Sequence, residues 1–235
     1  MNRFVLSLSA LLFAATASNA APIFSDPAGD VFNGTAPDIV SYSGDLAPGG
    51  TTYQFTVTFA APISPFSAFA ANSVLGYLDF DTDRNAATGG NAPFGGNQPG
   101  GNSFINFGVA NGFLPGPPIA LGDEFFIDLS TEGGGLVGLF RTSDNTLVSN
   151  VPISFTGNSF TVSVPASALG NPGSFNYGIF AGDLTGFSAD RAPNGAAPAV
   201  TTPEPASAAV FGLLCAAAGG YFRHRRPRPT AARPV

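Results

Sequence analysis

The sequence predicts an all-β fold, a two-sheet antiparallel β-sandwich of the jelly-roll type, from three observations. Hydrophobic and polar side chains alternate with period two through much of residues 21–200. Turn-forming residues separate these short segments, since the chain has 30 glycines and 21 prolines. The 23 phenylalanines supply large rings that can fill the space of about 10 Å between two packed sheets. Together these features favour about nine short strands in two layers.

The clearest strand is expected at residues 52–59, where Tyr53, Phe55 and Val57 share one face and threonines and a glutamine occupy the other. Gly157-Asn158 is a tight-turn signal that joins two neighbouring strands in a hairpin. One helical turn is expected from Pro165 to Leu169. The further expected strands cover residues 39–46, 74–81, 103–110, 124–129, 135–141, 146–155, 160–164 and 175–181.

Charge is strongly unbalanced in the predicted domain. Residues 21–200 contain three arginines and fourteen carboxylates, a net charge of −11, and the whole chain has no lysine. Such a surface repels nucleic acid and anionic lipid, and it attracts divalent cations. We therefore expect no nucleic-acid partner.

Few kinds of enzyme chemistry remain open. The only histidine is His224, close to the C-terminus, so the domain lacks a Ser-His-Asp triad, a Cys-His pair and a histidine-ligated zinc. We expect a protein that is not an enzyme. A glycoside hydrolase with a carboxylate pair remains an alternative, and its candidates are Asp123, Glu124 and Asp128. The simpler interpretation of these three residues is a solvated strand start.

Residues 1–20 have the three parts of a secretory signal peptide. Arg3 gives a positive start, an apolar run follows from Phe4 to Ala15, and Ser18-Asn19-Ala20 places small residues before the cleavage point. This pattern predicts export through the inner membrane. The mature β-sandwich domain is then expected over residues 21–194.

The C-terminal end has a second membrane signal. A linker at residues 195–205 ends in Pro203-Glu204-Pro205, and an uncharged segment follows at residues 206–222. As a helix this segment would reach roughly 25 Å, the short end of a membrane span. Arg223, Arg225 and Arg226 begin a basic tail at residues 223–235, and such cations stay on the cytoplasmic side of a membrane.

This tail resembles the PEP-CTERM sorting signal, which also carries the label "ice-binding protein C-terminal domain". The resemblance covers Pro203 to Arg226. It implies that the partner is an exosortase, a membrane-embedded cysteine protease or transpeptidase of certain Gram-negative bacteria. It also implies cleavage near Pro203–Pro205 and a location in the cell envelope, on the cell surface or in a biofilm matrix of exopolysaccharide. A plain C-terminal membrane anchor is the alternative.

An acidic string forms the densest polar group of the domain. Asp79, Asp81, Asp83 and Asn85 end one expected strand, and a spacing of two places the carboxylates on one face. Calcium takes six to eight oxygen ligands, and a loop of this spacing supplies several. The string is not an EF-hand, because Arg84 stands where that loop needs glycine. We expect a calcium site of another kind; the alternative is a solvated acidic turn that discourages edge pairing.

Two more acidic stretches, Asp26 to Asp30 and Asp190 to Asn194, open and close the domain and are candidates to converge with this string. With the strand pattern, they loosely resemble the DOMON and family-nine carbohydrate-binding β-sandwiches. That resemblance implies binding of a sugar or a cofactor. Exopolysaccharide or envelope glycan is the candidate partner, and a calcium-assisted carbohydrate-binding module is the first alternative function. The leading expectation is an exported, exosortase-sorted protein whose β-sandwich has a binding or structural role.

Overall fold

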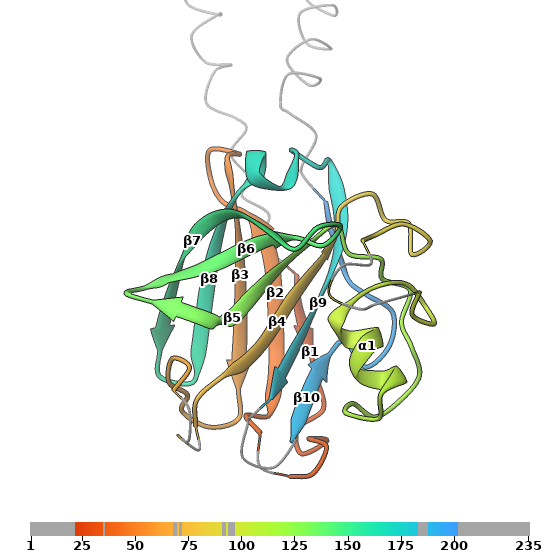
Figure 1. The fold of residues 1–235 in the computed structure, drawn as a ribbon. Helices are drawn as coiled ribbons and strands as arrows, with labels where there is room; N and C mark the ends of the chain where they lie inside the picture. Colours follow the sequence, from red (N-terminus) through yellow and green to blue (C-terminus); the bar gives the residue numbers. More distant parts are fainter. Residues whose placement is uncertain are drawn as a thin grey trace, which may run out of the picture. The chain divides into compact units, whose positions relative to one another are not determined.

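The chain forms an antiparallel all-β domain. The computed structural model describes residues 22–34, 36–67, 70, 72–90, 93, 97–182 and 188–201. The strands are β1 (Ile23–Ser25), β2 (Ile39–Leu46), β3 (Thr52–Phe59), β4 (Leu75–Asp81), β5 (Phe125–Gly133), β6 (Leu136–Arg141), β7 (Thr146–Thr156), β8 (Ser159–Pro165), β9 (Ser174–Gly182), β10 (Ala189–Ala192) and β11 (Ala199–Thr201). One α-helix, α1 (Phe104–Ala110), and one 3-10 turn, η1 (Ala166–Leu169), complete the described elements (Figure 1).

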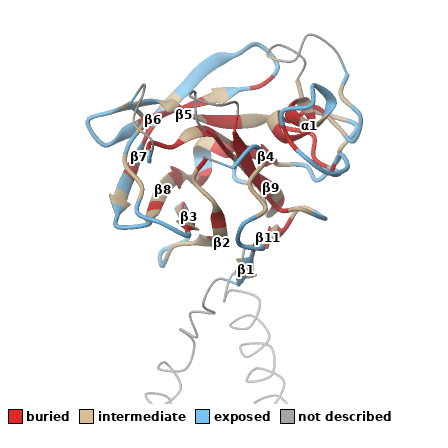
Figure 2. Cartoon of the chain, turned by 90° about the horizontal axis from the view of Figure 1, so that it is seen from below, coloured by how far each residue is buried: buried red, intermediate tan, exposed pale blue. Residues whose placement is uncertain are grey.

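All the described strands are joined in one hydrogen-bonded sheet. Its order is β1-β2-β3-β8-β7-β6-β5-β4-β9-β10, and β11 also pairs with β9. Strand β7 links the two halves, because Leu136 to Arg141 of β6 pair with its first part and Ser159 to Val162 of β8 pair with its second part. The sheet is therefore continuous, and it curls so that its two halves face each other (Figure 2).

The hydrophobic core lies between these two halves. Alternate residues of β3 point inward, as period two requires, and rings of β9 meet them from the other half. Phe55 lies 5.2 Å from Tyr177 between ring centroids, and Tyr53 lies 4.8 Å from Phe175. Since β3 and β9 are not neighbours in the sheet, these contacts can form only across the core. Figure 2 shows buried residues gathered between the two halves of the curled sheet.

The two edges of the curled sheet come together at a seam. Phe32, in the connection between β1 and β2, exchanges two backbone hydrogen bonds with Ala189 of β10, at 2.8 and 3.1 Å. The Ser188 hydroxyl adds two more, since it accepts from the Ala36 amide and donates to the Phe32 carbonyl. We call this junction the seam. It ties the segment before β2 to β10.

Most of the expected strands are confirmed, including residues 39–46 and 52–59 with their bounds, and so is the hairpin at Gly157-Asn158. The helical turn at Ala166–Leu169 also forms as expected. The short strands β1, β10 and β11 were not expected. Because β11 pairs with β9, the sheet extends past the predicted domain boundary at residue 194 and into the predicted linker.

The expected strand at residues 103–110 is wrong, because this segment forms helix α1. The Ser103 side chain caps the helix by accepting a hydrogen bond from the Asn106 amide at 3.1 Å. The Asn106 side chain then binds loop carbonyls of Gly101 and Ile119 and accepts from the Ile119 amide. These side-chain bonds satisfy polar groups that a strand would have to pair with a neighbour.

The predicted signal peptide at residues 1–20 lies outside the described residues. So do the membrane segment at 206–222, the tail at 223–235 and the sorting residues Pro203, Glu204, Pro205, Arg223, Arg225 and Arg226. Within the part of the chain that the structure describes, no helix is long and apolar enough to cross a membrane.

Candidate metal sites

Three carboxylates gather where β4 ends and the neighbouring strand β5 begins. Asp81 is the last residue of β4, Asp83 follows it in the loop, and Glu124 directly precedes β5. The antiparallel register pairs Phe80 with Phe125, which brings Glu124 beside the end of β4. One carboxylate oxygen from each of the three lies within 4.8 Å of the others. We call Asp81, Asp83 and Glu124 the loop cluster.

The loop folds around the first two of these carboxylates. The backbone amide of Asn85 donates to Asp81 Oδ1 at 3.0 Å and to Asp83 Oδ1 at 2.9 Å. The Thr88 hydroxyl lies 3.0 Å from both oxygens of Asp83. Asn176, opposite Asp81 in β9, donates to Asp81 Oδ2 at 3.4 Å. These contacts hold the two carboxylates in place before any ligand binds.

Glu124 is held in the same way on one oxygen only. Its Oε2 accepts from the Thr82 amide at 2.7 Å and from the Thr82 hydroxyl at 3.2 Å. Its Oε1 is buried and has no hydrogen-bond partner among the described residues. Burial raises the pKa of Glu124 and also that of Asp81, which is wholly buried. Asp81 is thus a buried carboxylate with donors on both oxygens, whereas the half-buried Glu124 has one oxygen without a donor among the described residues.

The structure brings together two of the four residues expected to bind calcium, and it places the other two differently. Asp79 does share the outer face of β4 with Asp81, but helix α1 covers it, and its Oδ2 accepts from the Ile105 amide at 3.1 Å. The Asn85 side-chain oxygen accepts from the Ala87 amide, so Asn85 contributes its backbone amide to the loop. Glu124 joins the group through strand pairing, which spacing within one segment does not reveal.

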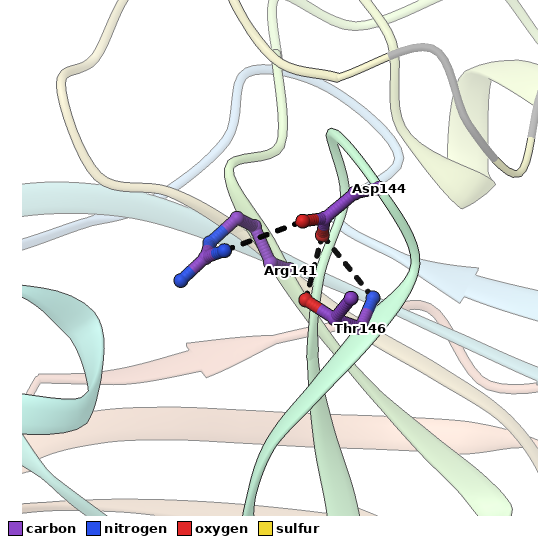
Figure 3. A network of polar contacts seen from close by, with 3 residues as sticks. All are labelled: Arg141, Asp144 and Thr146. Atoms are coloured by element: carbon purple, nitrogen blue, oxygen red, sulfur yellow. Dashed lines mark hydrogen bonds and ion pairs between the residues drawn. The ribbon is translucent and has the colours of Figure 1, made fainter.

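Positive charge is scarce near the loop cluster. Arg84 donates to the Ser174 hydroxyl at 3.2 Å, and it forms no ion pair that the structure describes. Among the described residues the one ion pair joins Arg141 and Asp144 at 3.3 Å, across the exposed turn between β6 and β7. Figure 3 shows this pair with Thr146, whose amide and hydroxyl also donate to Asp144. Arg141 therefore neutralises Asp144, whereas the acids of the loop cluster have no such ion pair among the described residues.

The acidic stretches at the two ends of the domain meet each other, at the seam. Oxygens of Asp26, Asp30 and Asp190 lie within 4.8 Å of one another. Along β9, Asp190 stands opposite Ala181 and Asp81 stands opposite Asn176. Five residues of strand separate these positions, which corresponds to about 17 Å along the strand. The seam group is therefore separate from the loop cluster, contrary to the expected convergence.

A pocket of about 280 Å³ opens beside the acidic loop. It is lined by small residues and by amide and hydroxyl side chains, namely Ala86, Ala87, Thr88, Asn97, Gln98, Gly101 and Asn102. Thr88 belongs to both features, because its hydroxyl also binds Asp83. Side chains of this kind pair with the hydroxyl groups of polar ligands.

The three candidates for glycoside hydrolysis do not form an exposed pair. Asp123 is wholly buried, and Glu124 is fixed to Thr82. Asp128 accepts from the amide and hydroxyl of Ser130, at 2.9 and 2.6 Å, within its own strand. A glycosidase needs two carboxyl groups on either side of an accessible glycosidic bond.

A comparison of the chain with protein-family models and a comparison with curated proteins each find no match.

Proposed function

We propose that this chain is an exported, non-enzymatic protein of the cell envelope or extracellular matrix, whose β-domain binds calcium at the loop cluster. The observation that carries the proposal is the convergence of Asp81, Asp83 and Glu124 with no ion pair to an arginine among the described residues. The three groups come from the end of β4, the following loop and the start of β5, so an ion bound among them would fasten this loop to the sheet.

The electrostatics of the loop cluster favour a divalent cation. Two unit charges 4.8 Å apart repel each other by roughly 3.5 kcal/mol at an effective dielectric constant of 20. A bound cation replaces this repulsion by attraction. The donors are all oxygens, with no histidine or cysteine in residues 21–200. Oxygen donors select calcium or magnesium over zinc and copper, and the irregular loop geometry suits the flexible coordination of calcium.

The fold supports a structural or binding role. We interpret the curled sheet as a two-layer sandwich of the jelly-roll type, on the basis of the ring contacts that cross the core between β3 and β9. The burial of Asp123 and the fixed position of Glu124 leave no accessible carboxylate pair at the start of β5. A rigid scaffold with bound ions therefore agrees better with the geometry than a hydrolase does.

Export and sorting rest on the two ends of the sequence. A signal peptide at residues 1–20 and the Pro203-Glu204-Pro205 motif, apolar segment and arginine cluster support processing by an exosortase. Mass spectrometry of the protein from its native envelope tests this proposal. The expected C-terminus lies near Pro205, and changing Arg223, Arg225 and Arg226 to alanine should leave the tail attached. Full-length protein found free inside the cell would contradict the proposal.

Isothermal titration of the full-length chain in mild detergent tests the calcium site. Asp83→Asn removes one charge of the loop cluster, and we expect it to weaken binding at this site at least tenfold. Asp144→Asn is the matched control, because Asp144 is paired with Arg141 on an exposed turn. The control should bind as the unchanged chain does. Equal calcium binding by both variants would refute the site.

A calcium-assisted carbohydrate-binding module is the second candidate, favoured by the amide-lined pocket beside the loop. In this function the ion would hold the loop in the shape that a sugar contacts. A glycan array probed with and without chelator tests it. Binding that disappears with chelator and with Gln98→Ala would favour the module, whereas no binding to any glycan would leave the structural role.

A further inference from the structure

The seam contains a second group of carboxylates, drawn from segments far apart in the sequence. Asp26 follows β1, Asp30 lies in the connection to β2, and Asp190 lies in β10. We call these three residues the seam cluster. Asp26 and Asp190 are 7% and 2% exposed. The Asn194 side-chain amide donates to Asp26 Oδ1 at 3.1 Å and to Asp30 Oδ2 at 2.7 Å, which orients both groups.

Several oxygens at the seam are buried without a partner. Among the described residues, Asp26 Oδ2 and Asp30 Oδ1 have no hydrogen-bond donor, although both are shielded from water. The same holds for Oδ1 of Asp38, which precedes β2 and whose other oxygen accepts from the Gly29 amide. An ionised carboxylate buried in this way loses its hydration without compensation. Such oxygens are suited to bind a cation.

Asp190 is already fixed in position by the backbone. Its Oδ2 accepts from the Ile39 amide at 2.6 Å and its Oδ1 from the Arg191 amide at 2.7 Å. The first of these bonds joins β10 to the start of β2, across the seam. The carboxylate therefore stands between the two sheet edges, where a bound ion would contact both.

The nearby Arg191 attracts the acids of the seam cluster but forms no ion pair with them among the described residues. Asp190 lies opposite Ala181 of the core, so the next residue, Arg191, points to the other face of the sheet. There its guanidinium donates to the Pro117 carbonyl at 3.0 Å. No ion pair within 4.0 Å links Arg191 to an acid in the part of the chain that the structure describes. Among the described residues the seam cluster therefore has three carboxylates and no ion pair with an arginine.

We propose that the seam cluster is a second divalent-cation site, of the calcium class, which fastens the segment between β1 and β2 to β10. Asp26, Asp30 and Asp190 supply carboxylate oxygens, and Asp38 stands beside them with a further unpartnered oxygen. The site is independent of the loop cluster, because the two lie far apart along β9. Its ion closes the curled sheet by joining its first and last edges.

Burial also raises the pKa of Asp26, an effect to which the neighbouring Asp190 and Asp30 add, and burial raises the pKa of Asp190.

Native mass spectrometry of the full-length chain, with calcium as the probe, tests the proposal by counting bound ions. We expect two ions on the unchanged chain, one on Asp30→Asn and one on Asp83→Asn. A single ion that disappears with Asp83→Asn and persists in Asp30→Asn would overturn the seam site and leave the loop site. A single ion that disappears with Asp30→Asn and persists in Asp83→Asn would overturn the loop site and leave the seam site.

Amide hydrogen exchange gives a second readout, and it uses the unsubstituted chain, so it does not require any variant to fold. Calcium should slow exchange of the Phe32, Ile39 and Ala189 amides at least tenfold, because their hydrogen bonds cross the seam. The Leu46 amide donates to the side chain of the adjacent Asp45, away from the seam, and serves as the internal control. Its exchange rate should not change. Unchanged exchange at all three seam amides in saturating calcium would overturn the proposal.

Discussion

Asp79 and Asp123 are both wholly buried, and their carboxyl groups lie close enough for the charge of Asp79 to raise the pKa of Asp123. Desolvation by burial is the largest cause, and it raises the pKa of both groups. Asp79 lies against helix α1, because its Oδ2 accepts from the Ile105 amide at 3.1 Å. Asp123 directly precedes Glu124 of the loop cluster in the chain.

The proximity of these two buried acids predicts how Asp123 tolerates substitution. Asp123→Asn places an amide donor near Asp79 and should change the free energy of unfolding by less than about 1 kcal/mol. Asp123→Ala leaves Asp79 buried without its partner and should cost about 3 kcal/mol. Urea unfolding in metal-free buffer at neutral pH measures both values. Equal losses for the two variants would show that a polar neighbour of Asp79 contributes nothing.

The acids of the seam predict an unusual dependence of stability on pH. The pKa of Asp26 is about 8 in the folded chain against 3.8 as the ordinary value, and that of Asp190 is about 7. Between the ordinary pKa of 3.8 and these raised values, the folded chain binds more protons than the unfolded chain. The free energy of unfolding must therefore fall as the pH rises through this window.

Thermal melting of the metal-free chain at two pH values measures this effect. About pH 5.5 lies within the window, and about pH 8 lies at its upper end. We expect a lower melting temperature at pH 8. Replacing Asp26 with Asn should reduce the difference, whereas the Asp144→Asn control should keep it. A melting temperature that rises from the lower to the higher pH would contradict the assignment.

Helix α1 depends on its cap. Ser103→Ala removes the hydroxyl that accepts from the Asn106 amide and should destabilise the domain by roughly 1 kcal/mol. Ser103→Asp should preserve the acceptor, although it adds a charge close to Asp79. Chemical unfolding monitored by circular dichroism compares the two with the unchanged chain. If Ser103→Ala had no effect, the cap would not contribute to stability.

The sequence predicts the features of this fold that depend on neighbouring residues. The strand at residues 52–59 is visible because Tyr53, Phe55 and Val57 alternate with polar residues, and tertiary packing agrees with that pattern. The hairpin at Gly157-Asn158 is equally local, because Gly157 takes a φ of 61°, a conformation that favours glycine. Long alternating segments thus carry their own structural signal.

Features that depend on distant residues were missed. Glu124 joins the loop cluster only through the pairing of β4 with β5, and the seam cluster requires β10 to reach the connection after β1. The segment at 103–110 alternates as a strand does, but it forms a helix in which Asp79 accepts an amide from the first turn. Spacing alone does not reveal that distant contact, whereas Ser103 at the N-cap is a local signal of a helix start. The strands β1, β10 and β11 are too short to show a period.

Calcium-dependent stability tests the central claim most directly. Full-length protein is melted in chelator and then in calcium, with magnesium as the ionic control. At a concentration one hundred times the dissociation constant, one bound ion stabilises the folded chain by about 2.7 kcal/mol, which corresponds to roughly 5–10 °C. We predict a rise of this size with calcium, reduced in Asp83→Asn and retained in Asp144→Asn. An unchanged melting temperature at millimolar calcium would contradict the account.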